Sequence, residues 1–127
     1  MATTAQFTAT PKVGVVVIST ANTGRDGTGT LGIVFTAGAS GSRIERVQIK
    51  AQATTTAGMV RLFVHNGTTS YLLTEIQVAP ATPSGTLSSY EATFVFDGGL
   101  VIPAGYSLRA STNNAESFNV IALGGDF

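Results

Sequence analysis

The chain has 127 residues, a length typical of one domain, and it contains no cysteine, which excludes disulfides and thiolate metal sites. Seven basic and seven acidic residues give a formal net charge of zero, whereas nucleic-acid-binding proteins normally carry a basic excess. Charged residues make up only 11% of the chain, and such a chain tends to self-associate as a free monomer. We therefore expect other subunits to cover much of its surface, the alternative being a soluble monomer coated with Thr, Ser, Gly and Asn.

We expect neither a membrane segment nor a signal peptide in the N-terminal region. The longest strongly apolar run, residues 13–18, is far shorter than the roughly 20 residues that cross a bilayer as a helix. Residues 1–10 lack the basic start and the apolar segment of a signal peptide. We expect no membrane partner, a flexible N-terminal arm over residues 1–11 and a single domain over residues 12–127.

Apolar and alternating runs predict eight main strands. β-Branched and aromatic residues recur along the chain between short Gly-, Asn- and Pro-containing segments, which is typical of β-sandwiches and barrels. The first run is almost continuously apolar, which predicts a strand covered on both faces. A short extended piece at residues 100–102 follows an expected turn at residues 97–99. The predicted main strands cover residues 12–19, 30–37, 47–53, 59–65, 70–78, 86–97, 106–112 and 117–123.

The links between these strands indicate how they connect. Asn66-Gly67 is a strong signal for a tight hairpin. Residues 20–29 predict a long exposed loop, and residues 79–85, with two prolines, predict a crossing loop. We predict an all-β fold, an eight-stranded antiparallel β-sandwich of jelly-roll type. An immunoglobulin-like sandwich is the alternative, although the chain has no Trp and no Cys pair.

Residues suited to catalysis or metal binding are scattered. His65 is the only histidine, so neither a catalytic triad nor a histidine metal site is indicated. Asp26, Asp97 and Asp126 lie in Gly-rich segments, where calcium could bind, but each stands alone, without an Asp-x-Asp spacing. We predict no enzyme, no catalytic residue, no cofactor and no metal site.

One strand offers a candidate contact between subunits. Met59, Arg61 and Phe63 share one face of the strand at residues 59–65, because the alternating aliphatic residues occupy the other face. An exposed Phe-Met pair is typical of a subunit contact. In that case Phe63→Asp separates the subunits and leaves the fold intact. The alternative is that a loop covers this second face of the strand.

Residues 98–110 resemble the segment that leads into the penultimate strand of trimeric jelly rolls, such as tumour necrosis factor-like and related viral domains. Residues 41–127 also resemble small virion proteins of tailed bacteriophages. The motifs that carry the second resemblance are Ile44-Glu45-Arg46-Val47, Phe63-Val64-His65-Asn66-Gly67 and Asn119-Val120-Ile121-Ala122.

This resemblance implies a non-enzymatic capsid decoration (cement) protein that binds and stabilises the phage head lattice as a homotrimer. Its implied partners are the major capsid protein or other virion subunits, and its implied location is the capsid surface after synthesis in the host cytoplasm. The alternative is a carbohydrate-binding or receptor-binding module of a tail fibre or adhesin. Such a module would use the loops at residues 20–29 and 79–85.

Overall fold

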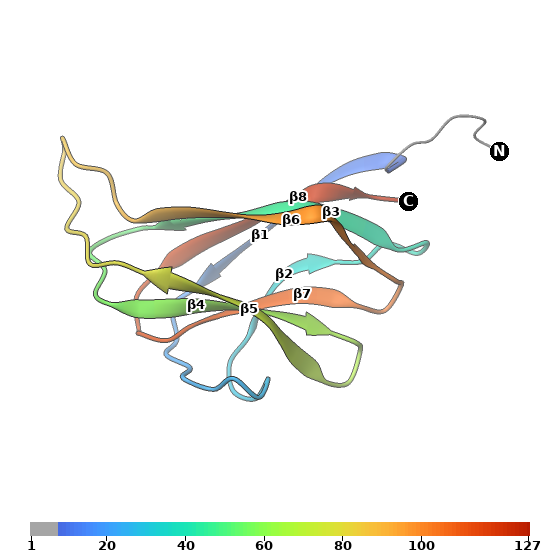
Figure 1. Cartoon of the computed structure of the whole chain (residues 1–127), viewed down its shortest axis with the longest axis horizontal. Coiled ribbons are helices and arrows are strands. Elements are labelled where there is room, and N and C mark those ends of the chain that lie inside the picture. Colours follow the sequence, from blue (N-terminus) through green and yellow to red (C-terminus); the bar gives the residue numbers. More distant parts are fainter. Residues whose placement is uncertain (1–7) are drawn as a thin grey trace.

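The computed structural model describes residues 8–127, which form eight antiparallel strands and no helix (Figure 1). The prediction of an all-β sandwich is confirmed. Within this part of the chain, no helix is long and apolar enough to cross a membrane. The strands are β1 (Thr10–Ile18), β2 (Gly32–Thr36), β3 (Ser42–Ala51), β4 (Gly58–His65), β5 (Ser70–Val78), β6 (Glu91–Ile102), β7 (Ser107–Thr112) and β8 (Phe118–Asp126).

The strands form two four-stranded sheets. Sheet A has the order β1-β8-β3-β6, and sheet B has the order β2-β7-β4-β5. Antiparallel pairing joins β1 with β8, β2 with β7, β3 with β6 and β4 with β5, so the pairs are nested along the chain. This nested order is the jelly-roll arrangement, an architecture found in viral capsid and lectin domains and in cupins.

Alternation along the strands places aliphatic side chains between the two sheets. Val47 and Ile49 of β3 and Val60 and Leu62 of β4 are fully buried, as their period-two spacing predicts. They belong to one hydrophobic cluster that draws on both sheets. Burial of this apolar surface provides the main favourable term in folding, since the chain has no disulfide.

Strand β1 begins two residues earlier than predicted. Thr10 and Pro11 pair with Asp126 and Gly125 at the end of β8. Pro11 is tolerated there because β1 lies at the edge of sheet A, where a strand can lack an amide donor. Residues 1–7 of the predicted arm lie outside the described residues, so flexibility of the arm stays a prediction.

Strand β6 shows that the turn predicted at residues 97–99 is wrong. The strand continues through Gly98 and Gly99, which have φ angles of 78° and 85°, and both of its halves pair with β3. The register shifts by a bulge between Ile44 and Arg46 of β3. Glycines with positive φ are typical of bulges as well as turns, so a Gly-Gly pair alone does not distinguish the two structures.

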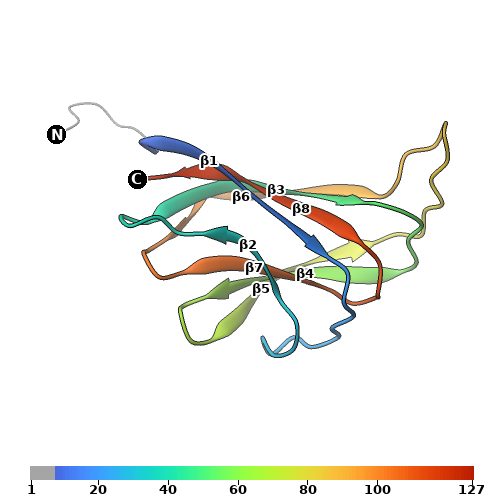
Figure 2. The ribbon, with the colours of Figure 1, turned by 180° about the vertical axis from the view of Figure 1, so that it is seen from behind.

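Two long connections extend from the sandwich. Residues 79–90, between β5 and β6, project away from the sheets in both views (Figures 1 and 2). Residues 19–31, between β1 and β2, lie below sheet B in the same views. We call residues 19–31 the covering loop, because they lie against the outer face of sheet B.

Candidate interaction surface

The outer face of sheet A carries exposed aliphatic side chains along β1. Val13, Val15 and Val17 are exposed by 58%, 60% and 53% of their surface. Because side chains alternate along a strand, Val16 and Ile18 face the core instead. The sequence-based expectation that both faces of this strand are covered therefore fails within a single chain.

Strand β8 extends this apolar surface. Leu123 pairs with Val13 and Ile121 pairs with Val15, and both β8 side chains are partly exposed. The five residues together form what we call the apolar strip: Val13, Val15, Val17, Ile121 and Leu123. A contiguous apolar surface of this kind marks interaction sites in soluble proteins.

Polar residues of β3 border the apolar strip on one side. Arg46 pairs with Leu123, and Gln48 pairs with Ile121. Edge strands usually carry charged outward side chains that discourage association, whereas the three outward positions in the middle of β1 are all valine. The arrangement of an apolar centre and a polar border is the one that protein interfaces show.

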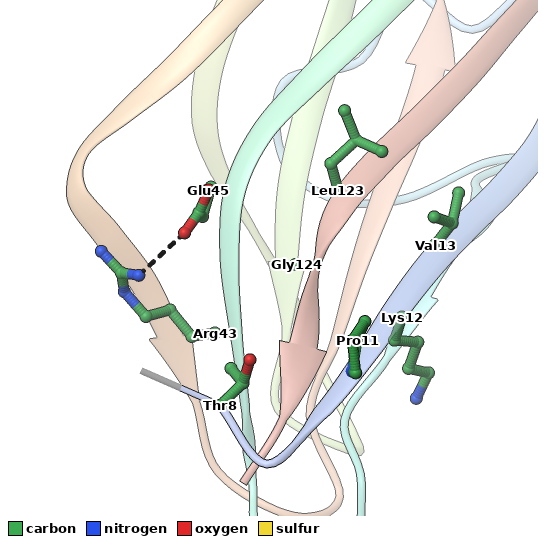
Figure 3. A pocket seen from close by; sticks show the side chains of 8 residues that line it. All are labelled: Thr8, Pro11, Lys12, Val13, Arg43, Glu45, Leu123 and Gly124. Carbon is green, nitrogen blue, oxygen red and sulfur yellow. Dashed lines mark hydrogen bonds and ion pairs between the residues drawn. The ribbon is translucent and has the colours of Figure 1, made fainter. Parts of the chain in front are cut away.

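A hollow of about 290 Å³ adjoins the apolar strip near the chain ends (Figure 3). Val13 and Leu123 line it on the side of the strip, and Arg43 and Glu45 form an ion pair of 3.0 Å on the opposite side. Gly124 lies between them, and a Cβ atom there would come within 2.1 Å of the Arg43 carbonyl oxygen. Strand β8 can therefore pass this close to β3 only because residue 124 is glycine.

The outer face of sheet B holds the predicted subunit contact, and here the predicted exposure is wrong. Phe63 is 0% exposed and Arg61 is 3% exposed. Arg61 Nη1 donates a hydrogen bond to the Asn22 carbonyl of the covering loop at 3.3 Å. The alternative of a strand covered by a loop is the one observed. Only Met59 keeps a partly exposed side chain, and its contact with another subunit stays a prediction.

An ion-pair network fixes the covering loop to sheet B. Glu75 Oε2 on β5 accepts hydrogen bonds from Arg25 Nε at 2.8 Å and from Arg61 Nε at 2.9 Å. The bond from Arg25, together with that from Arg61, lowers the pKa of the Glu75 carboxyl. Arg61 also donates to Asn113 Oδ1 at 3.2 Å. This one side chain of β4 therefore binds β5, the covering loop and the connection between β7 and β8.

The described residues contain no group of three or more His, Cys, Asp or Glu side chains that could hold a metal ion. His65 Nδ1 lies 2.8 Å from Ser70 Oγ across the β4–β5 hairpin. Asp26 accepts hydrogen bonds from Thr28, and Asp126 accepts them from Ser42 and Lys12. These carboxylates stabilise local structure, since each is bound by residues of its own loop or sheet end.

A second hollow, lined mainly by polar residues, lies beside the covering loop on the outer face of sheet B. Asp26 from the loop, His65 from β4 and Arg109 from β7 line it together. Sequence reasoning did not connect these residues, because 83 positions separate Asp26 from Arg109. The alternation of Arg109 with the buried Leu108 and Ala110 was the available signal that its side chain faces outward.

Fold and surfaces together define a jelly-roll β-sandwich with an exposed apolar strip on one sheet and a loop-covered outer face on the other. No family model and no curated protein matches the chain.

Among the solved structures that align with this chain are the following three, and the chain spans less than two thirds of the length of each. A pentameric capsid protein isolated from metagenomic phage sequences is 16% identical, over 88% of this chain and 59% of that chain, with a TM-score of 0.39. Dimeric latent PorU from Porphyromonas gingivalis is 11% identical, over 98% and 14%, with a TM-score of 0.39. A structure of infectious bursal disease virus, Gx strain, is 14% identical, over 92% and 34%, with a TM-score of 0.37. Similarity at this level is too low to assign a function.

Proposed function

We propose that the chain is a non-enzymatic structural protein of a virion, and more specifically a capsid decoration protein that binds the phage head lattice as a homotrimer. The apolar strip is the observation that carries the proposal. Neighbouring copies of the chain cover it in the trimer, so that β1 becomes buried on both faces, as its continuous apolar run predicts.

The physical reason for association through the apolar strip is that exposed apolar surface is unfavourable in water. Burial of apolar surface is favourable by about 25 cal/mol per Å², and a stable interface buries about 800 Å² on each partner. The apolar strip and the adjoining hollow form one continuous surface through Val13 and Leu123. A chain with few charges and zero net charge offers little electrostatic repulsion against such association.

A separate surface is available for the capsid. Residues 79–90 project from the sandwich (Figure 1). Leu87, in the turn at residues 84–87, is 63% exposed. In this proposal the loop contacts the major capsid protein or another virion subunit at the capsid surface. The resemblance of residues 41–127 to small phage virion proteins supports the same assignment.

Val15→Asp tests the proposed trimer contact. The side chain lies in the middle of the strip and is exposed in the single chain, so an aspartate there leaves the fold intact while placing a charge in the contact. We expect light scattering after size exclusion to show a trimer for the unchanged chain and a monomer for Val15→Asp.

Leu87→Asp is the matched control, because its side chain is as exposed as that of Val15 but lies on the projecting loop. We expect this variant to stay trimeric and to lose sedimentation with capsids. An unchanged chain that is monomeric at high concentration and does not bind capsids would overturn the proposal.

A further inference from the structure

The polar hollow on sheet B has the dimensions of a small-ligand site. Its volume is about 380 Å³, within the range of about 300–1,000 Å³ that such sites occupy. It opens on the face of the sandwich opposite to the apolar strip, so a ligand there does not compete with the proposed trimer contact. The lining residues are Asp26, Gly27, Thr28, Gly29, Leu31, His65, Thr68, Thr69, Ser70 and Arg109.

The walls of this hollow are held in place by packing and hydrogen bonds. Gly27 has a φ angle of 83°, and a Cβ atom there would lie 2.1 Å from the Ser70 carbonyl oxygen, so the covering loop sits tightly on β5. On the other wall, Asn66 Oδ1 accepts hydrogen bonds from the amides of Thr68 at 3.0 Å and Thr69 at 2.8 Å. A preformed site loses less conformational entropy when a ligand binds.

Two opposite charges line the hollow without pairing. Arg109 donates from Nε to Ser107 Oγ at 3.1 Å, and among residues 8–127 it forms no ion pair. Residues 1–7 contain no carboxylate side chain that could pair with it. Asp26 binds Thr28 through Oδ1. The hollow therefore presents an unneutralised guanidinium, and a carboxylate that can accept further hydrogen bonds.

Hydroxyl groups and the His65 imidazole supply the remaining polar side chains of the lining. The hydroxyls of Thr28 and Thr68 already donate within the chain, and Ser70 Oγ lies 2.8 Å from His65 Nδ1, so these oxygens serve a ligand as hydrogen-bond acceptors. A ligand that satisfies this set carries one carboxylate for Arg109, which binds carboxylates in bidentate geometry, and several hydroxyls for Asp26 and the Ser and Thr side chains. A simple anion offers Asp26 no hydrogen-bond donor beyond those of Thr28, and a neutral sugar leaves the guanidinium unpaired.

We propose that this hollow binds an acidic monosaccharide unit of the hexuronic acid class. Arg109 pairs with the sugar carboxylate, and Asp26 accepts hydrogen bonds from ring hydroxyls. The chain is then a bifunctional surface protein, assembling through sheet A and binding acidic glycans through sheet B.

The test is a titration of the full chain with D-glucuronate and D-galacturonate, followed by the backbone amide NMR signals. We expect saturable shifts at Thr68 and Ser70, and at least about tenfold weaker binding of D-glucose and D-galactose, which lack the charged acceptor. Glycine is titrated in the same way, because this small zwitterion carries a carboxylate and an ammonium group but no ring hydroxyls. Its binding shows whether the hollow recognises a sugar or only a pair of opposite charges. Absence of saturable shifts with both uronates, or equally tight binding of glycine, would overturn the proposal.

Arg109→Gln and Arg109→Lys examine the pairing group, and Arg46→Gln on the outer face of sheet A is the matched control. We expect Arg109→Gln to weaken uronate binding at least about tenfold, Arg109→Lys to weaken it less, and Arg46→Gln to leave it unchanged. Both variants are compared with the unchanged chain once they are shown to be folded. If Arg109→Lys and Arg109→Gln both bind uronate as tightly as the unchanged chain, the guanidinium does not recognise the sugar. Chain assembly is measured separately by light scattering, so the two proposals can fail independently.

Discussion

Phe63 is buried on the side of β4 that faces away from the core. It is fully buried, yet it does not belong to the cluster between the two sheets. On the same face of β4, the covering loop is bound to Arg61 through the Asn22 carbonyl. Phe63→Asp is therefore expected to unfold the chain rather than to separate subunits, because the substitution would bury an unpaired charge.

Phe63→Ala measures how much this buried side chain contributes to stability. Truncation of a fully buried Phe leaves a cavity, so we expect the free energy of unfolding to fall by about 3–5 kcal/mol in urea titrations. Met59→Ala, on the same face but partly exposed, should lower it by less. A loss below about 1 kcal/mol for Phe63→Ala would contradict this expectation and would show that the surrounding residues close the cavity easily.

The covering loop depends on one backbone position. Gly27 adopts the left-handed region, and its Cα atom lies against the Ser70 carbonyl. Other contacts of the loop include the backbone hydrogen bond from Asn22 N to the Thr112 carbonyl at 2.8 Å, and those of Asn22 Nδ2 to the carbonyls of Thr28 at 2.9 Å and Thr30 at 3.0 Å. The element is thus an ordered surface loop whose conformation is determined by its own side chains and by sheet B.

Gly27→Ala tests whether this contact holds the loop. A Cβ atom would meet a backbone oxygen, and positive φ is unfavourable for alanine, so we expect the loop to detach and stability to fall by at least about 1 kcal/mol. Hydrogen exchange of residues 20–31 should accelerate. Gly85→Ala, with no atom near the added methyl and no positive φ, is the control and should leave exchange unchanged. Equal exchange in both variants would contradict the role of Gly27.

At the scale of the whole molecule, Asp126 joins the two ends of the described chain. It lies at the end of β8, pairs with Thr10 of β1, and accepts hydrogen bonds from Ser42 and from Lys12 Nζ at 3.3 Å. The hydroxyl of Ser42, followed by the ammonium of Lys12, lowers the pKa of the Asp126 carboxyl. Hydrogen bonds from Thr28 lower the pKa of the Asp26 carboxyl. The hydrogen bond from Arg25 is the main cause of the lowered pKa of the Glu75 carboxyl.

These shifts predict acid destabilisation. A carboxyl whose pKa is lower in the folded state contributes stability that is present above its unfolded pKa of about 4 and is lost as the pH falls through the folded pKa. We expect the urea midpoint to decrease progressively below a pH of about 4. Asp126→Asn should decrease the midpoint at neutral pH and make its pH dependence shallower. A midpoint that is constant across the acid range would contradict this.

Local patterns were sufficient to predict eight main strands and the orientation of many of their side chains, but not the bounds of β3 and β6, which are Ser42–Ala51 and Glu91–Ile102. Val47, Ile49, Val60 and Leu62 alternate with polar or outward residues, and a period of two assigns them to the core whatever the partner strand is. The Asn66-Gly67 hairpin likewise depends on a turn of adjacent residues. The nested strand order also agrees with the jelly-roll prediction, which rests on the number of strands and the long crossing loop between the fifth and sixth of them.

Contacts between distant segments decided the surfaces. Whether Gly98-Gly99 is a turn or a bulge depends on pairing with β3. The burial of Arg61 involves the Asn22 carbonyl of the covering loop, 39 positions earlier in the chain. The approach of Asp26 to the hollow that Arg109 lines follows from the same loop. The sequence by itself determined the all-β class, the number of main strands and the low charge of this chain. Only the tertiary structure decided which apolar face stays exposed, because burial of a side chain depends on which segments pack over it.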